Sequence, residues 1–355
     1  MIVALDATPL TLTSGGLARY VADLSVALAR GYPEDTYVLL SDQKFVLPGG
    51  ACANLVEGPE TNKGKRWWLR GVRHAIATAG ALVFHGTNFE VPYLGRTPAI
   101  LTVHDLSPWR NPAWHTVGAE RVRTRTPWLI RLRRARLILT VSEAMRSEIV
   151  THFGVPEDCV RAVPLAASSL FRAVEGRHEL RNGKPYFLFV GTLEPRKNLA
   201  GLIGAWQATR EATGAELLIA GRTRADFVPI PPMEGIKYLG EVPDDGLPAL
   251  FSGALAFVYP TFYEGFGLPV LEAMQCGCPV ITSRDPAVAE ASGGAAIQAD
   301  SPGEIAQAMR AVAASAELRR ELQEKGLARA RHFSWERTAR ETHALYEEVI
   351  TGANR

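Results

Sequence analysis

The chain has 355 residues, of which 47% are hydrophobic and 21% are charged, and its formal net charge at pH 7 is +2. This length favours two domains, since single hydrophobic cores stop growing at about 250–300 residues. The composition excludes wholesale disorder, and with the charge close to balance we expect no nucleic-acid partner.

The cysteines and the N-terminus indicate the compartment. Cys52, Cys159, Cys276 and Cys278 show neither a disulfide framework nor paired metal-ligand spacing, which is typical of a reducing compartment. The opening MIVALDATPL lacks a basic leader and predicts a first strand rather than a signal peptide. No apolar run is long enough to span a bilayer. We therefore expect a cytoplasmic protein, soluble or peripheral at the inner face of the membrane.

The first half of the chain alternates short apolar runs with helical segments. Leu17–Arg30 has apolar residues at helical spacing. Continuous apolar strands separated by helices indicate a parallel, doubly wound sheet, and so one Rossmann-like domain. The predicted strands are Ile2–Ala7, Thr36–Ser41, Leu82–His85, Ala99–His104 and Arg136–Val141, with weaker ones at Asn54–Glu57 and Cys159–Val163.

The second half repeats this α/β pattern after a polar, turn-rich segment, Arg181–Pro185, which predicts domains of residues 1–180 and 181–334. In open parallel sheets ligands bind beyond the carboxyl ends of the strands, so we expect a ligand that bridges the two domains. The predicted strands are Tyr186–Val190, Glu216–Ala220, Ile236–Leu239, Leu255–Tyr259, Pro279–Thr282 and Ala295–Gln298, and the predicted helices are Asn198–Thr209, Glu304–Ala330 and Trp335–Ile350, the last capped by Ser334.

The stretch Tyr259–Ser283 combines the end of a strand, a glycine loop and the start of a helix. The Gly265–Gly267 loop and Pro269 in the first helical turn indicate that unpaired N–H groups and the positive end of the helix dipole meet there. Glu264 and Glu272 bracket this anion-binding geometry. They either belong to a ligand site or are an ordinary loop acid and an acid that complements the helix dipole.

A second loop of the same predicted sheet carries adjacent cations. Gly191 and Thr192 end a strand, and Arg196 and Lys197 then precede a helix. This arrangement fits a diphosphate, because arginine offers forked hydrogen bonds and lysine a compact charge. The alternative is two solvated loop cations. If both loops bind one ligand, they face the same crevice.

Two loops of the first half also follow predicted strands. Gly15 and Gly16 open a helix, where they either bring N–H groups to an anion or form a flexible turn. His85 and His104 stand at the ends of neighbouring strands. A lone histidine there is more often structural, but two of them, with Asp105 beside His104, favour a functional site. No HExxH motif or dense acidic cluster indicates a metal, so we expect neither metal nor cofactor.

Together these motifs resemble the large retaining glycosyltransferase group called group one or family four. The resemblance lies in Gly191–Asn198, reading GTLEPRKN, and in Glu264 and Glu272, which have seven residues between them and are followed by AMQCGCPV. It extends along the chain to Gly15-Gly16, Thr102–Asp105, Val141–Glu143 and Phe333–Glu336. The variant GTLEPRKN, with TVHDL upstream, is similar to the mannosyltransferase-like branch that assembles surface polysaccharides.

The resemblance implies a GT-B architecture, in which two Rossmann-like domains face a central cleft and the last helix, 335–355, packs back on the N-terminal acceptor domain. It implies that Arg196 and Lys197 hold the diphosphate of a nucleotide-sugar donor and neutralise the leaving group. Glu272 is implied to bind the ribose, Glu264 the sugar, and His104 to lie beside the reacting carbon. The other implied donor contacts are Gly15, Gly16, Gly191, Thr192, Gly240, Val242, Gly265, Phe266, Gly267 and Leu268.

The activity that this resemblance implies is a retaining, metal-independent hexosyl transfer to a saccharide or lipid-linked saccharide acceptor. GDP-mannose is the first donor expected, and UDP- or dTDP-sugars remain alternatives. A second class, a protein that binds a nucleotide sugar without transferring it, also stays open, because the fold alone does not determine the activity.

Basic residues cluster in two stretches of the predicted N-terminal domain. The segment 63–75 combines lysines and arginines with Trp67 and Trp68, and 121–136 holds seven arginines. One interpretation is that both clusters help to dock the protein on anionic lipid headgroups or a lipid-diphosphate acceptor, with 63–75 as the region of peripheral membrane contact. The other is an amphipathic helix with solvated arginines and core tryptophans.

Overall fold

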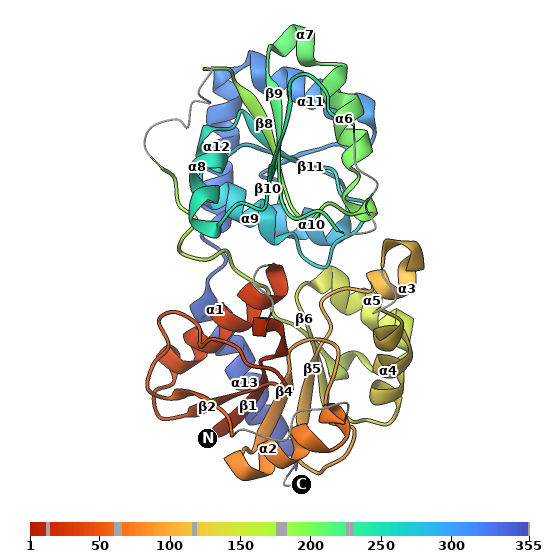
Figure 1. Cartoon of the computed structure of the whole chain (residues 1–355), viewed down its shortest axis with the longest axis vertical. Helices are drawn as coiled ribbons and strands as arrows, with labels where there is room; N and C mark the ends of the chain where they lie inside the picture. The colour runs from red at the N-terminus through yellow and green to blue at the C-terminus, as the bar shows by residue number, and fades with distance from the viewer. Residues whose placement is uncertain are drawn as a thin grey trace. The chain divides into compact units, whose positions relative to one another are not determined.

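The computed structural model describes residues 1–11, 15–59, 66–115, 119–174, 183–224, 227 and 231–353. The chain divides into two compact units, Met1–Leu165 with Ser334–Arg355, and Ala166–Phe333 (Figure 1). This division precedes Arg181–Pro185, the turn-rich segment that predicted the boundary, of which 181 and 182 lie outside the described residues. The second unit begins earlier because Gln275 donates hydrogen bonds to the carbonyl groups of Ser168 and Phe171, at 2.9 and 2.6 Å.

The first unit is built on a parallel sheet of seven strands in the order β3-β2-β1-β4-β5-β6-β7. All the strands that the sequence predicted in this half are present, with ends that differ by one or two residues. They are apolar along their length because helices cover both faces of the sheet. Their bounds are β1 Ile2–Asp6, β2 Thr36–Leu40, β3 Leu55–Glu57, β4 Val83–Gly86, β5 Ala99–Thr102, β6 Leu137–Thr140 and β7 Val160–Ala162.

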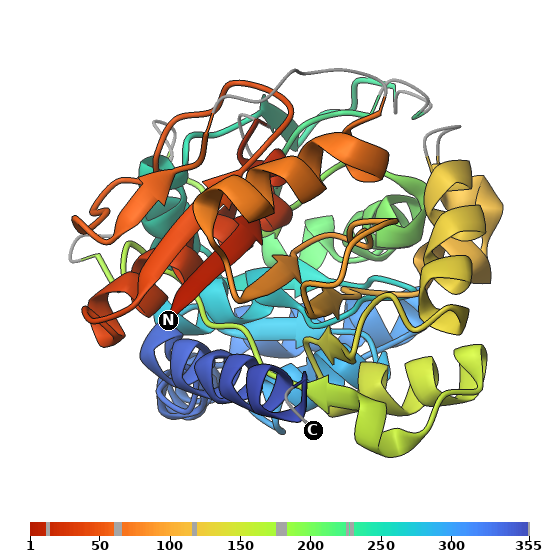
Figure 2. The same ribbon diagram turned by 90° about the horizontal axis from the view of Figure 1, so that it is seen from below.

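The helices of the first unit lie on both faces of this sheet. Figure 2 shows α2 on one face and α13 on the other, and α13 also packs along α1. The helices are α1 Gly16–Gly31, α2 Val72–Ala79, α3 Ser107–Arg110, α4 Ala119–Arg131, α5 Glu143–Phe153 and α13 Trp335–Ala353, with 3-10 turns at Thr8–Thr11, Pro112–Trp114 and Glu157–Cys159. Ser142 caps α5, since its side chain accepts a hydrogen bond from Met145 N at 3.1 Å.

Buried polar contacts fix α13, the last helix, on the first unit. Tyr346 is fully buried and its hydroxyl lies 2.7 Å from Nδ1 of His85 in β4. His343 lies 2.7 Å from the carboxylate of Asp35 and stacks on Tyr32, with ring centroids 3.4 Å apart. Burying one side chain as large as Tyr346 contributes about 1.5–3 kcal/mol, so these contacts hold a helix that is distant in sequence.

Trp67 and Trp68 belong to the core of the first unit. They begin a short π-helix, Trp67–Gly71, that leads into α2, and they are only 4% and 9% exposed. Trp68 packs edge-on against Phe84, with ring centroids 6.4 Å apart. The interpretation that places these tryptophans in the core is therefore confirmed, and their rings do not face solvent. The neighbouring lysines, at 63 and 65, lie outside the described residues.

The second unit has a parallel sheet of six strands in the order β10-β9-β8-β11-β12-β13. The strands are β8 Tyr186–Val190, β9 Glu216–Ala220, β10 Ile236–Gly240, β11 Ala256–Tyr259, β12 Val280–Thr282 and β13 Ile297–Gln298, again as predicted. The helices are α6 Leu199–Gln207, α7 Arg210–Thr213, α8 Leu247–Gly253, α9 Leu268–Gln275, α10 Pro286–Ser292, α11 Pro302–Ala314 and α12 Ala316–Ala330, with 3-10 turns at Pro195–Lys197 and Asp244–Gly246.

One helix prediction in the second unit is wrong. The segment Glu304–Ala330 forms two helices, α11 and α12, rather than one. The break falls at Ser315, whose extended backbone ends the first helix and whose side chain accepts a hydrogen bond from Leu318 N at 3.0 Å. A serine that caps the following helix thus interrupts a pattern that is otherwise continuously helical.

The four cysteines are free thiols, as the sequence predicted. Cys276 and Cys278 are buried, and burial raises the pKa of the Cys276 thiol to about 12, which keeps it protonated. Among the described residues, no helix combines the length and the hydropathy that crossing a bilayer requires.

Candidate functional site

The predicted ligand residues of the second unit lie at the carboxyl edge of its sheet. β8 pairs with β9 on one side and with β11 on the other, so the loops that follow these three strands are neighbours. An isolated bridge between Leu193 and Thr223 joins the first two of these loops beyond the strand ends. The β8 loop carries Arg196 and Lys197, and the β11 loop carries Glu264.

Glu264 is held between two cations. One of its carboxylate oxygens, Oε2, lies 2.9 Å from Arg196 Nη1, and the other, Oε1, lies 2.5 Å from Lys197 Nζ. The same Oε1 accepts hydrogen bonds from the hydroxyl groups of Thr261, at 2.8 Å, and Tyr259, at 3.1 Å. The side chains of Lys197 and Glu264 are only 7% and 10% exposed. The sequence predicted these charged residues as site residues, but not that they pair with one another.

A third cation, Arg224, completes this cluster and was missed. Glu194 lies 2.6 Å from Arg196 Nε through one oxygen and 3.3 Å from Arg224 Nη1 through the other. The cluster therefore contains three cations and two carboxylates, and has an excess of one positive charge. The signal that could have found Arg224 is its place just beyond β9, in the loop next to the one that carries Arg196. We call Glu194, Arg196, Lys197, Arg224 and Glu264 the cation cluster.

Burial and pairing set the protonation of the cation cluster. Burial opposes ionisation of Glu264, but Arg196 and Lys197 outweigh it and lower the pKa of this carboxyl to about 2. Burial and the charge of Arg196 lower the pKa of Lys197, whereas Glu264 and Glu194 raise it. Glu264 is therefore ionised at neutral pH, which keeps the two cations paired in the absence of a ligand.

The start of α9 provides the predicted anion-binding backbone. Gly267 caps the helix with φ of 104°, a left-handed conformation that favours glycine, and Leu268 is the first helical residue. Glu272 lies one turn further along α9 and is 1% exposed. Phe266 is buried and packs edge-on against Phe333, with ring centroids 5.8 Å apart. These contacts fix the loop, so its N–H groups point along a defined direction.

A further acid near this loop, Asp285, was also missed by sequence analysis. One of its oxygens, Oδ1, caps α10 by accepting hydrogen bonds from Ala287 N and Val288 N, both at 3.1 Å. The other, Oδ2, accepts a hydrogen bond from Glu264 N at 3.4 Å. Burial, with the charge of Glu264 adding to it, raises the pKa of Asp285 to about 6. Asp285 therefore positions the backbone of Glu264.

Two other predicted parts of the donor site lie at the same edge. Gly191 and Thr192 directly follow β8, and Gly240 ends β10 with Val242 two residues beyond. Gly221, directly after β9, allows the β9 and β8 loops to approach closely, because a Cβ there would lie 2.0 Å from the carbonyl oxygen of Gly191. The two loops that were expected to face one crevice, with Arg196 and Lys197 on one and Gly265–Gly267 on the other, follow neighbouring strands of one sheet, and the roles of their residues stay predictions.

The predicted residues of the first unit lie at the carboxyl edge of the first sheet. His104 follows β5, and one of its ring nitrogens, Nε2, lies 2.8 Å from the carbonyl oxygen of Thr87. A carbonyl only accepts, so Nε2 carries the proton and Nδ1 is the acceptor. Burial lowers the pKa of His104, against the effects of Thr87 and Asp105, so the ring is neutral at pH 7. Gly15 caps α1 and Gly16 begins it, whereas 12–14 of the same loop lie outside the described residues.

His85 has a structural place rather than a place in an open site. It is fully buried, and its Nε2 lies 2.7 Å from the hydroxyl group of Thr102, while its other nitrogen contacts Tyr346. Burial, with a contribution from His104, lowers the pKa of His85 to about 3. Of the two strand-end histidines, His104 alone stays a candidate for ligand contact. In the part of the chain that the structure describes, no group of three or more His, Cys, Asp or Glu side chains is arranged to hold a metal ion.

Comparison with known proteins identifies the family. Residues 14–167 match the family model described as Glycosyltransferase Family 4, and residues 172–329 match the one described as Glycosyl transferases group 1. O-antigen chain mannosyltransferase B from Escherichia coli is 39% identical over 293 residues, which are 75% of this chain and 74% of that protein. The chain belongs to the group 1 and family 4 glycosyltransferases.

This glycosyltransferase is also similar to O-antigen chain mannosyltransferase RfbU from Salmonella typhimurium, at 27% identity over 62% of the chain and 61% of that protein. Among solved structures, sucrose-phosphate synthase from Thermosynechococcus elongatus superposes with a TM-score of 0.74 and 18% identity, covering 99% of both chains. That likeness shows the fold. The predicted family and the GT-B architecture of two Rossmann-like domains are confirmed.

Proposed function

We propose that this glycosyltransferase moves mannose from GDP-mannose, with retention of configuration and without a metal, to a saccharide or lipid-linked saccharide acceptor in surface polysaccharide or glycoconjugate synthesis. The observation that carries the proposal is the cation cluster, which places Arg196, Lys197 and Arg224 at one edge of the second sheet. Two relatives that are named O-antigen chain mannosyltransferases support mannose as the sugar.

Donor binding exchanges partners within the cation cluster. Without donor, Glu264 occupies Arg196 and Lys197. A diphosphate carries more negative charge than one carboxylate and offers more oxygens, so it replaces Glu264 as the partner of both cations. Glu264 is then free to accept hydrogen bonds from the sugar hydroxyl groups, while Glu272 accepts them from the ribose and Gly267 and Leu268 donate N–H groups to phosphate. Glu264 thus pairs with the two cations when the site is empty and contacts the sugar when the donor is bound.

The chemical step breaks the bond between the anomeric carbon and the phosphate oxygen. Negative charge develops on the departing diphosphate, where Arg196 and Lys197 stabilise it in a buried environment. The acceptor hydroxyl group forms its new bond on the same face of the sugar, and its proton passes to the departing phosphate oxygen. The cations of the chain supply the charge that a metal would otherwise provide. For His104, Gly15, Gly16, Gly240 and Val242, we propose the donor contacts that the family resemblance implies.

A donor panel tests the proposal. The protein is incubated with GDP-mannose, UDP-glucose and dTDP-rhamnose, with and without candidate acceptors, and nucleoside diphosphate release is followed. Faster release with GDP-mannose and an acceptor than with the other donors is expected. Retention is read from the anomeric configuration of the product by NMR, and metal independence from activity in EDTA. Binding without release on any acceptor favours the alternative, a nucleotide-sugar-binding protein, and preference for a UDP- or dTDP-sugar changes the donor.

A peripheral membrane contact through 63–75 stays a proposal, but the two tryptophans of this segment no longer support it. Because Trp67 and Trp68 are buried, the residues of this segment that face solvent within the described structure include Arg66, Arg70 and Arg73. These arginines attract anionic headgroups but insert nothing into the bilayer. The segment also exposes Leu69, at 37%, and the part of the contact that rests on charge is reduced strongly by salt.

A further inference from the structure

A continuous run of hydrogen-bonding groups crosses the core of the first unit from α13 to α1. The hydroxyl group of Tyr346 lies 2.7 Å from His85 Nδ1, and His85 Nε2 lies 2.7 Å from the hydroxyl group of Thr102. The same Thr102 hydroxyl group lies 3.2 Å from that of Tyr20. The four residues are at most 2% exposed and come from α13, β4, β5 and α1. We call Tyr20, His85, Thr102 and Tyr346 the buried chain.

The buried chain satisfies its own hydrogen bonds. Burial keeps His85 neutral by lowering its pKa to about 3, so one ring nitrogen donates and the other accepts. Either position of the ring proton serves both neighbours, because a hydroxyl group can donate or accept. Apolar side chains of the same shape would give a core of similar stability, whereas a complete buried chain fixes one arrangement of the elements around it. The position of Tyr20 is therefore closely defined.

Tyr20 brings the buried chain to His104. The ring of Tyr20 packs edge-on against the imidazole of His104, with centroids 4.9 Å apart and planes at 84°. Trp335, the first residue of α13, also packs against Tyr20, with centroids 6.5 Å apart. Trp335 and Tyr346 are about three turns apart on α13, so they lie on the same side of this helix. The last helix thus holds Tyr20 both directly and through the buried chain.

Phe89 also packs against His104, with ring centroids 6.2 Å apart. Its backbone N–H donates a hydrogen bond to the carbonyl oxygen of Thr102, at 3.0 Å. Its φ of 61° is a left-handed conformation that is costly for a residue with a large side chain, and such strain is typical of functional sites. Thr102 therefore holds two rings that pack on His104: Tyr20 through its hydroxyl group and Phe89 through its carbonyl group.

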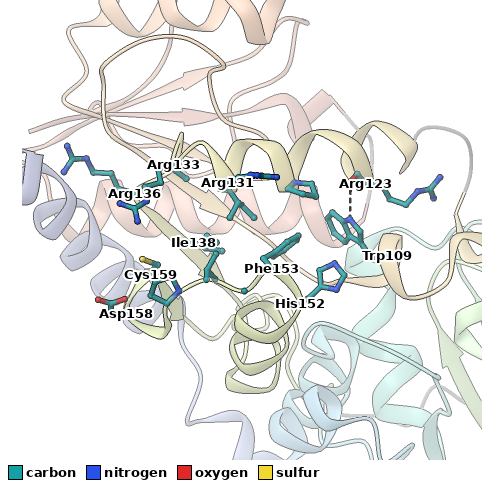
Figure 3. Close-up of a pocket in the computed structure, with 16 residues that line it drawn as sticks. Trp109, Arg123, Arg131, Arg133, Arg136, Ile138, His152, Phe153, Asp158 and Cys159 are labelled. Atoms are coloured by element: carbon teal, nitrogen blue, oxygen red, sulfur yellow. Dashed lines mark hydrogen bonds between the residues drawn. The ribbon is translucent and has the colours of Figure 1, made fainter.

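Trp109 supports Phe89 from the groove between α4 and α5. The ring centroids of Trp109 and Phe89 are 6.1 Å apart, and Trp109 packs edge-on against Phe153, at 5.4 Å. Its Nε1 donates a hydrogen bond to the carbonyl oxygen of Arg123, at 3.3 Å, and Figure 3 shows this contact at one end of the groove. Contacts from α3, α4 and α5 thus fix Phe89, as contacts from α13 and β5 fix Tyr20.

The imidazole of His104 is therefore held at one atom and in its plane. Its Nε2 donates to the carbonyl oxygen of Thr87, and the rings of Tyr20 and Phe89 set the plane. Nδ1 is left to accept a hydrogen bond in a fixed direction. A contact in the transfer step depends on that direction, because a displacement of about 1 Å can slow a reaction on the order of 100-fold.

We propose that Thr102 and Tyr20 are positioning residues that orient His104 for transfer, and that His85 and Tyr346 hold Thr102 in place. His85 then affects the reaction although it touches no ligand. The inference rests on the proposed function for the contact between His104 and the donor. The orientation of the His104 ring, in contrast, is measured without sugar transfer.

A double-mutant cycle tests whether Thr102 acts through His104. T102V keeps the shape of the side chain and its backbone contacts but removes the hydroxyl group. It is expected to lower kcat with GDP-mannose by about 10-fold or more and to leave KM within about two-fold, whereas T102S retains the activity. In H104A, which itself slows transfer, T102V is expected to change kcat by less than about two-fold. Additive effects of the two changes, or an unchanged kcat in T102V or H104A, overturn the proposal.

T209V is the matched control. Thr209 is fully buried in the second unit, and its hydroxyl group donates a hydrogen bond to the carbonyl oxygen of Trp206, at 2.8 Å. T209V therefore also removes a buried hydroxyl group, and it is expected to lower the melting temperature without changing kcat. An equal loss of kcat in T209V and T102V would mean that destabilisation causes both losses, and it overturns the proposal.

NMR of the protein labelled with 15N-histidine gives a readout that needs no activity. H104A identifies the signals of His104, which are expected to be those of a neutral ring protonated on Nε2. T102V and Y346F are expected to shift these signals, because the ring currents of the two flanking rings act on them, and T209V is not. Unmoved signals in T102V overturn the proposal, and unmoved signals in Y346F overturn the part assigned to His85 and Tyr346. If the unchanged protein consumes no donor, the proposed function fails, and these signals alone decide the inference.

Discussion

Cations in two regions of this glycosyltransferase experience opposite environments. In the cation cluster, the side chains of Arg196 and Lys197 are 16% and 7% exposed and each contacts a carboxylate. On α4, the side chains of Arg121 and Arg125 are 48% and 45% exposed, and Arg131 and Arg133 face solvent. The difference is one of burial, since both regions are rich in fixed positive charge.

This difference determines what each region can bind. A buried cation interacts strongly over a short range, because little water screens it, and its geometry is held by its partners. Such a cluster suits a compact dianion that must be placed to within a fraction of an ångström. An exposed arginine acts through a field that salt screens over about 8–10 Å, which suits a diffuse anionic surface. The following changes test whether burial is the property that separates the two regions.

The largest effect is expected from K197A. This change removes a buried cation from the proposed diphosphate site and leaves Glu264 with one cation fewer. Truncating one member of a buried charge pair costs about 2–5 kcal/mol, so donor affinity and kcat/KM are expected to fall by about 30-fold or more. Calorimetric titration with GDP-mannose and steady-state kinetics measure the two quantities.

The melting temperature of K197A is expected to fall as well, because the partly unpaired Glu264 stays buried. Circular dichroism at a temperature well below melting serves as the control for folding. A folded K197A with unchanged donor affinity would remove Lys197 from the diphosphate site and would contradict the assignment of the cation cluster.

The change E264Q separates binding from transfer. The amide keeps the shape of the carboxylate but releases Arg196 and Lys197 from their ion pairs. GDP, which lacks the sugar, is expected to bind as well as before or a few-fold more tightly, whereas kcat is expected to fall by about 10–100-fold because a charged contact to the sugar is lost.

The matched variant is E272Q, since Glu272 is assigned to the ribose on α9. This change is expected to weaken GDP binding and to leave kcat close to normal, which is the opposite pattern. If E264Q weakens GDP binding without slowing transfer, then Glu264 holds the nucleotide and the exchange of partners in the cation cluster is wrong.

Most of the architecture was available from the sequence. The strands of both sheets are continuous apolar runs bounded by turn residues, and that pattern predicts buried parallel strands directly. The prediction failed where one residue decides between two conformations, as at Ser315, where a capping hydrogen bond divides the predicted helix. The sequence also left open whether Trp67 and Trp68 lie in the core or at the surface, because a basic amphipathic segment is equally compatible with a membrane surface and with a core.

The candidate site was predictable in its residues but not in its pairing. The motif around Arg196 and Lys197 indicates cations, and the loop around Glu264 indicates an acid. That they neutralise one another depends on which strands are neighbours. Arg224 and Asp285 were missed for the same reason, since each follows a strand without any local motif and joins the site only through sheet order. Pair geometry of this kind requires the fold.

A buried carboxylate without a cation extends the comparison to the first unit. Asp6 is 2% exposed at the end of β1, and its Oδ1 accepts hydrogen bonds from Thr8 N, at 3.0 Å, and from the Thr8 hydroxyl group, at 2.6 Å. In the described part of the chain no cation pairs with it. Burial raises the pKa of Asp6 to about 7, whereas the pKa of the paired Glu264 is about 2.

The two acids are therefore expected to change stability with pH in opposite directions. Glu264 stabilises the folded protein above the ordinary pKa of a glutamate, and this contribution is lost as the pH falls towards 2. Asp6 has a raised pKa in the folded state, so ionising it lowers stability as the pH rises from about 4 to 7. D6N, which keeps the Thr8 contacts, is expected to melt at least about 3 °C higher than the unchanged protein at pH 8 and at the same temperature at pH 3.

Thermal melts of both proteins across this pH range measure the difference. A gain that is the same at pH 3 and pH 8 would mean that D6N acts through packing rather than through the charge of the carboxylate. The buried charge of Asp6 would then not be the cause of the stability that the unchanged protein loses at higher pH.

The smallest effect is expected from K325A, on the surface of α12. Lys325 Nζ lies 2.6 Å from Glu321 Oε1, almost the same distance as between Lys197 and Glu264, but both side chains are 54% exposed. An exposed pair of this spacing contributes about 0.3–0.5 kcal/mol, so K325A is expected to lower the melting temperature by less than about 2 °C.

Salt separates the two lysine–glutamate pairs. At about 1 M salt the screening length is ~3 Å, so the loss in K325A is expected to disappear, whereas most of the loss in K197A is expected to persist because salt does not enter the buried cluster. K325A is also expected to leave donor affinity unchanged in titrations, in contrast to K197A. If the two variants lose stability equally, and salt abolishes both losses, then burial does not distinguish the cation cluster from a surface ion pair. Its cations would then have no special capacity to stabilise a leaving diphosphate.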